Sequence, residues 1–311
     1  MTNDIYLKST ITALAMCTAS QVNAAPLDIR LNYTNPVDPT FSEAMDSAVQ
    51  IWEYLLPSYA SPRRDVSGLL NPATGAPFAG TLELQISVEA IDGFGGSFGS
   101  VGPSRIFSSE DGTNLYTHAG NLVFDEVDIQ NFAFRGSLVP LFTHQMAHML
   151  GFGTLWDSGP YDLTNNEEFS GPIYQPTEYR GVNGLAAYRA EVDPTADFIP
   201  LEQFPAPGVF GRQWDESDPG APSAVPGNFF QDELMGGILD FSETQFISET
   251  TVASFADLGY NTRANYDAMT LEQLIDAASA PPVVPLPAAG WMLLMGLGGF
   301  GVMRWSPRKS V

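Results

Sequence analysis

Alternation of apolar and polar residues predicts the first strands of this chain. The pattern holds over Leu27–Tyr33 and Leu82–Val88, and the short apolar run Asn121–Asp125 adds a third strand. Between the first two strands, Phe41–Leu56 carries apolar residues three and four positions apart, which is typical of an amphipathic helix, and Pro57 ends it. The N-terminal half therefore mixes strands with a helix.

A glycine-rich stretch, Asp92–Pro103, follows the second predicted strand. It lacks the Lys-Ser/Thr pair of a phosphate-binding loop, and no helical pattern comes after it. We therefore interpret it as a turn-rich connection.

A second helix is predicted over Leu138–Leu150. Ser137 suits its N-cap, Pro140 falls in the first turn, where its missing N–H costs little, and Gly151 suits the position after the last turn. This helix carries the residues on which the functional prediction depends.

The stretch from Gly153 to about Asn228 is rich in Gly, Pro, Asn and acidic residues and shows no clear period. We predict a long irregular segment, which in a compact domain is usually functional or built of surface insertions. A last helix is predicted over Glu249–Leu258, with Ser248 as its cap and Gly259 after its end.

The N-terminus has the order of a secretory signal peptide. Lys8 precedes the apolar run Ile11–Ala19, and Val22-Asn-Ala24 resembles a cleavage site, so we predict that residues 1–24 are removed on export. The only cysteine, Cys17, lies in this segment. The single domain expected over residues 25–280 is therefore held together by core burial, by bound metal, or by both.

The C-terminal segment, residues 281–311, begins with a proline-rich stretch. The uncharged run Ala288–Met303 follows and comes near the length of a bilayer span, and Arg304, Arg308 and Lys309 come after it. We predict one transmembrane helix with the basic end in the cytoplasm. The segment resembles the PEP-CTERM sorting signal of Gram-negative bacteria, which implies an exosortase-type partner, export across the inner membrane, and a place in the envelope, on the surface or in the extracellular matrix.

Charge excludes one class of partner. The chain of 311 residues has 13 Lys and Arg against 36 Asp and Glu, so its formal net charge is −23. Attraction to the phosphates of nucleic acid, or to anionic lipid, is therefore not expected.

Two histidines in the second predicted helix suggest a metal site. His144 and His148 are four residues apart, so their imidazoles share one helix face, one turn apart, as two ligands of one zinc ion require. The alternative is that both are polar residues in the floor of a disused cleft.

The motif Thr143-His-Gln-Met-Ala-His-Met-Leu-Gly151 resembles the zinc helix of metzincin peptidases, His-Glu-x-x-His-x-x-Gly. Gln213-Trp214 lies 62 residues after Gly151 (213 − 151), where bacterial leishmanolysin-like members have His-Trp, and Glu233-Leu-Met-Gly-Gly237 resembles their Met-turn. This resemblance implies an α+β zincin fold with a mixed sheet, a central zinc helix and a loop-rich C-terminal lobe. It also implies that Met235 lies beneath the metal.

Two positions depart from that family. Gln145 replaces the general-base Glu, and Gln213 replaces the third histidine ligand. A neutral amide accepts no proton from metal-bound water, and zinc prefers imidazole, thiolate or carboxylate to an amide oxygen. Zinc binding is therefore expected to be weak or absent.

A carboxylate is the alternative source of the lost chemistry. Asp215 and Glu216 follow Gln213 closely and could ligate zinc in its place. Asp157 and Glu202 are weaker candidates for a substitute base. The third histidine, His118, has no motif around it, and we interpret it as an ordinary surface or strand residue.

The sequence therefore favours a pseudopeptidase or binding module with a peptide or polysaccharide ligand in its cleft. An active but atypical zinc endopeptidase is the alternative.

Overall fold

The protein is described by a computed structural model that covers residues 25–71, 75–78, 80–95, 98–165, 177–203, 211–215, 232–237 and 244–280. The predicted signal peptide, the C-terminal segment with its predicted transmembrane helix, and Glu216 lie outside these ranges. Within them, no helix combines the length and the apolar character that a membrane crossing needs.

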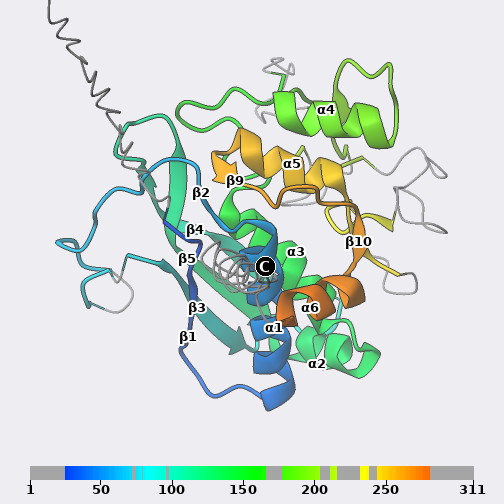
Figure 1. Cartoon of the computed structure of the whole chain (residues 1–311). Coiled ribbons are helices and arrows are strands. Elements are labelled where there is room, and N and C mark those ends of the chain that lie inside the picture. The colour runs from blue at the N-terminus through cyan, green and yellow to red at the C-terminus, as the bar shows by residue number, and fades with distance from the viewer. Residues whose placement is uncertain are drawn as a thin grey trace, which may run out of the picture.

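The described elements follow one another in a mixed order of helices and strands (Figure 1). They are β1 (Ile29–Tyr33), α1 (Pro39–Leu55), β2 (Ser58–Tyr59), β3 (Leu82–Glu89), β4 (Gly99–Ser108), β5 (Leu115–Asp125), α2 (Glu126–Arg135), α3 (Leu138–Leu150), β6 (Glu178–Tyr179), α4 (Val182–Glu191), β7 (Ile199–Pro200), β8 (Phe246–Ile247), α5 (Glu249–Asp257), β9 (Tyr260–Asn261), β10 (Met269–Thr270) and α6 (Leu271–Ser279).

The central sheet has the strand order β1-β3-β5-β4. The first three strands run parallel, and β4 pairs antiparallel with β5 at one edge. A mixed sheet of this kind, with helices packed against it, confirms the α+β class.

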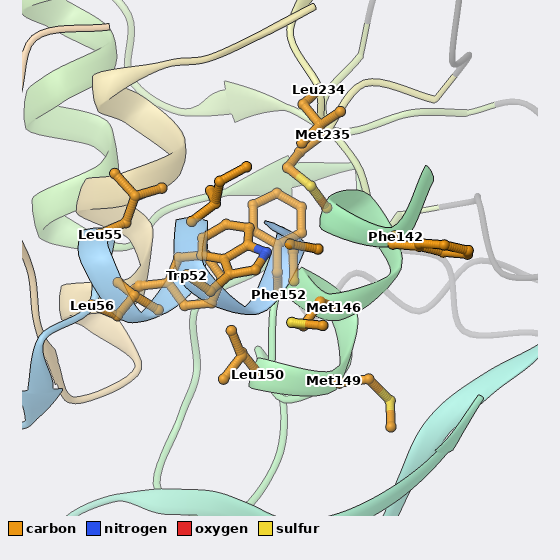
Figure 2. Close-up of a cluster of buried hydrophobic side chains, with 14 of the residues drawn as sticks. Trp52, Leu55, Leu56, Phe142, Met146, Met149, Leu150, Phe152, Leu234 and Met235 are labelled. Carbon is orange, nitrogen blue, oxygen red and sulfur yellow. The ribbon is translucent and has the colours of Figure 1, made fainter. Parts of the chain in front are cut away.

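Helix α3 packs closely on the sheet because of a glycine in β5. A Cβ atom at Gly120 would lie 1.8 Å from the Cε of Met149, so a larger residue there would displace the end of this methionine side chain. Helix α1 packs beside α3, and the indole N–H of Trp52 donates to the carbonyl of Thr143 at 2.8 Å. Figure 2 shows the buried side chains around this contact, among them Phe142, Met146 and Leu150.

A carboxylate joins helices α4 and α5. Asp257, at the end of α5, accepts the main-chain N–H groups of Asn183 and Gly184 at 2.9 Å each, in the first turn of α4. Two orphan N–H groups of α4 are thereby satisfied, and the charge lies where the helix dipole favours it.

Two sequence predictions were wrong in part. The interpretation of Asp92–Pro103 as a turn-rich connection fails from Gly99 onward, where β4 begins. Gly99 has φ +143, and a Cβ there would lie 1.8 Å from the carbonyl oxygen of Val123, so its glycine serves close strand pairing. The stretch predicted as irregular contains α4 and the short strands β6 and β7.

Helices α2 and α6 were not predicted, although each has a local start signal. Asp125 caps α2 by accepting the N–H groups of Val127 and Asp128, and Thr270 forms a capping box with Gln273 at the start of α6. Both helices are short, nine or ten residues, and few of their residues are buried. A run of nine or ten residues holds few repeats of the helical period, which makes such a helix hard to recognise in the sequence.

Candidate metal centre

Helix α3 spans Leu138–Leu150, as predicted, and it carries both candidate ligands on its buried side. Gly151 ends it in the left-handed region with φ +119. Ser137 occupies the N-cap position, but its side chain makes no capping bond. His144 and His148 are only 3% and 7% exposed, so their orientation is set by protein contacts and not by solvent.

The two imidazoles are held by main-chain carbonyls. His144 Nδ1 lies 2.7 Å from the carbonyl oxygen of Leu234, and His148 Nδ1 lies 2.9 Å from that of Phe152. Because a carbonyl oxygen only accepts, each Nδ1 carries the proton and each Nε2 presents a lone pair. The two Nε2 atoms are 3.1 Å apart. This is the arrangement in which outer contacts aim histidines at a metal.

Gln213 completes a triangle with the imidazoles. Its amide nitrogen lies 3.1 Å from Nε2 of His144 and 3.4 Å from Nε2 of His148. Neighbouring nitrogen donors of a tetrahedral zinc ion are about 3.3 Å apart. The structure thus brings together the three positions predicted from sequence, although 65 residues separate His148 from Gln213.

The segment that carries Gln213 reaches α3 because its main chain passes close to Gly153. Gly153 has φ +67, and a Cβ atom there would lie 2.2 Å from the carbonyl oxygen of Arg212. Any other residue would push this segment away from the helix. The next residue, Trp214, bridges to Leu201 on one side and Gly236 on the other, and it is 1% exposed. Gln213 is therefore fixed by its backbone as well as by its amide.

Met235 lies in a buried turn that contacts two corners of this triangle through its main chain. Its side chain is fully buried, and its carbonyl accepts the N–H of Trp214 at 3.0 Å. Figure 2 shows Met235 pointing toward the helix that carries Phe142 and Met146. Its neighbour Leu234 supplies the carbonyl for His144. The turn thus links the histidine and glutamine segments.

A buried carboxylate that the sequence reasoning missed holds this turn. Glu233 accepts hydrogen bonds from the N–H of Met235, from the N–H and hydroxyl of Ser248, and from the hydroxyl of Thr251. The hydroxyl of Thr251 in turn accepts the indole N–H of Trp214 at 2.8 Å. Burial raises the pKa of Glu233 to about 7 despite these donors. Its position in a Glu-Leu-Met motif was the available signal.

Both histidines are neutral at physiological pH. Burial lowers the pKa of His144 to about 4, and burial together with the adjacent His144 lowers that of His148 to about 3. Neutral imidazoles keep their Nε2 lone pairs, as metal ligands must.

The predicted substitutes that the structure describes, Asp215, Asp157 and Glu202, do not join the triangle. Among the described residues, no group of three His, Cys, Asp or Glu side chains is placed to hold a metal ion, and Asp215 is therefore not a third donor beside the imidazoles. Asp157 accepts the hydroxyl of Thr164. Glu202 donates its main-chain N–H to the carbonyl of Gln213, and its side chain lies against Gly237. Gln145 is partly exposed on α3, next to His144.

His118 lies in strand β5, but the surface alternative was wrong, because it is 1% exposed. Its ring packs edge-on against Phe107, with the ring centroids 5.0 Å apart. Burial, with Arg63 and Arg64 nearby, lowers its pKa to about 3. It takes no part in the triangle.

The distances between the three side-chain nitrogen atoms resemble those around a zinc ion, but the amide of Gln213 is a poor zinc ligand. Gln213 offers zinc only a neutral amide oxygen, and no carboxylate occupies the general-base position. No protein-family model and no curated protein matches this sequence. The chemistry of the site therefore carries the functional argument.

Proposed function

We propose that this chain is an exported, surface-directed relative of the leishmanolysin-like metzincins in which the peptidase site has lost its chemistry, so that the protein acts as a pseudopeptidase or binding module. The observation that carries the proposal is the amide of Gln213 at the third corner of the donor triangle, 3.1 Å from His144. Gln145 at the base position agrees with it.

Several features support a metzincin-like arrangement. Helix α3 bears two histidines and ends at a glycine, a distant segment brings Gln213 to them, and the buried turn at Met235 contacts both segments. The mixed sheet has an antiparallel edge strand, β4, beside α3. The general-base glutamate and the third histidine, which would activate water in such an arrangement, are replaced by Gln145 and Gln213.

The loss of hydrolysis follows from proton chemistry. A peptidase of this class needs a group that takes a proton from the attacking water, and an amide side chain cannot do so. Losing a positioned general base costs roughly 10² to 10⁴ in rate. Replacing the third ligand lowers metal affinity in addition.

Peptide binding can survive the loss of catalysis. Strand β4 is one of the two edge strands of the sheet among the described residues, and many of its residues are partly or fully exposed. A strand at the edge of a sheet can recognise extended peptides through main-chain hydrogen bonds, which need no metal. A polysaccharide in the same place is the other ligand class to be tested.

A protease assay with restored residues tests the proposal. The wild-type chain is expected to cleave neither casein nor a peptide library, whereas Gln145→Glu combined with Gln213→His is expected to bind zinc and cleave. Gln145→Glu alone is the matched control, because it restores the base without the ligand. Chelator-sensitive cleavage by the wild type would refute the proposal and favour the atypical peptidase.

The location is proposed from the two ends of the chain. A signal peptide over residues 1–24 and a PEP-CTERM-like segment over 281–311 would direct the domain through the inner membrane to exosortase-type sorting machinery. Mass spectrometry of the mature protein should find the N-terminus at Ala25. An intact Met1 on surface-exposed protein would contradict this route.

A further inference from the structure

The two imidazoles create an electrostatic problem at the centre of the site. Both Nδ1 protons are committed to carbonyl oxygens, so both Nε2 atoms are acceptors, and they face each other at 3.1 Å. Two lone pairs at that distance repel unless a positive group lies between them. In a peptidase of this kind the metal ion supplies it.

Gln213 supplies two N–H groups at this place. Its amide nitrogen is within hydrogen-bonding distance of both Nε2 atoms, at 3.1 and 3.4 Å, so each hydrogen can be donated to one ring. The opposite orientation would aim a third acceptor at the two lone pairs. With the amide nitrogen facing the rings, Oε1 of Gln213 has no hydrogen-bond partner among the described residues. The side-chain amide thus has its donor end directed at the two imidazoles, while its acceptor oxygen makes no hydrogen bond within the described residues.

We infer that Gln213 is a metal-independent clasp: its amide N–H₂ takes the place of an ion between His144 and His148, so that the folded domain needs no metal. This role of Gln213 deepens the proposed function and rests on it, because the proposed function is what states that the protein hydrolyses no peptide. Zinc binding would require the amide to turn and give up both hydrogen bonds. The clasp thus opposes zinc as well as replacing it.

The surroundings are built for a fixed amide. Gln213 is 5% exposed, and the main chain on either side of it is held by the bridge from Trp214 to Leu201 and by the approach of Arg212 to Gly153. A buried side chain on a fixed backbone loses little further entropy on forming its bonds. We therefore expect the clasp to add to the stability of the fold.

Thermal unfolding of the full-length chain, in excess chelator and in about 100 µM zinc, tests the inference. The wild type should have the same midpoint in both within about 1 °C and should hold less than about a tenth of an equivalent of zinc after purification. Gln213→His should unfold about 5 °C or more higher with zinc than with chelator, and it should hold about one equivalent. Gln130→His, on the exposed side of α2, is the matched control and should behave as the wild type.

A second variant keeps the test decisive if the histidine variant does not fold. Gln213→Met preserves the length of the side chain but removes both N–H donors, so its midpoint should fall by about 5 °C in chelator. A wild type that zinc stabilises as strongly as Gln213→His, or a Gln213→Met variant as stable as the wild type, would overturn the clasp. Neither outcome depends on cleavage, which tests the proposed function separately.

Discussion

The approach of Arg212 to Gly153 gives a sharp prediction about how the distant glutamine is positioned. Gly153→Ala adds a Cβ that would lie 2.2 Å from the carbonyl oxygen of Arg212, whereas real Cβ contacts are essentially never under 3.0 Å. The segment must therefore move by about 0.8 Å (3.0 − 2.2) or more. Gln213 follows directly in the chain and moves with it.

The magnitude has two parts. Alanine at a positive φ costs roughly 1–2 kcal/mol. Displacing the amide from 3.1 and 3.4 Å weakens both of its hydrogen bonds, each worth about 1 kcal/mol. We expect Gly153→Ala to lower the free energy of unfolding by about 3–4 kcal/mol.

A second glycine separates the two parts. Gly112 has φ +72, close to the +67 of Gly153, but a Cβ there would meet nothing within 4 Å. Gly112→Ala should therefore lose only about 1–2 kcal/mol. Urea unfolding followed by tryptophan fluorescence measures both variants. Equal losses would refute the reasoning, because the close approach would then carry no energy.

Two pH dependences follow from buried groups. Burial raises the pKa of Glu233 from 4.5 to about 7, so its contribution to stability is complete below pH 4.5 and is lost as the pH rises toward 7, by about 3 kcal/mol. Glu233→Gln should be less stable but lack this slope in urea titrations across that range; an unchanged slope would contradict the assignment. His118 has its pKa lowered from 6.5 to about 3, so its contribution is complete above pH 6.5 and falls by about 2 kcal/mol at about pH 5. His118→Phe should resist acid better than the wild type, and equal acid sensitivity would count against it.

The histidine pair shows what local sequence can decide. A spacing of four residues fixes a common helix face, and Pro140 and Gly151 mark the first turn and the end of α3, so the observed bounds Leu138–Leu150 agree with the prediction. Helix α5 likewise begins after Ser248, whose side chain accepts the N–H of Thr251. Such signals act over one or two turns, and they can be read without the rest of the fold.

The arrangement around Gln213 depended on tertiary structure. Resemblance placed Gln213 at the third-ligand position, but the sequence does not show that its amide nitrogen faces both imidazoles, or that Leu234 and Phe152 fix their tautomers. These contacts join segments far apart in the chain, and they form only when the domain has folded around α3.

Gly99 and Glu233 show the same division. The sequence around Gly99 indicates a turn, but pairing with β5 makes it the start of a strand. Glu233 is a charged residue by composition, and only its burial beneath Ser248 and Thr251 turns it into the anchor of the methionine turn. Helix periods and caps are local and were decided by sequence, whereas burial and long-range hydrogen bonding arise from packing, which no short stretch of residues contains.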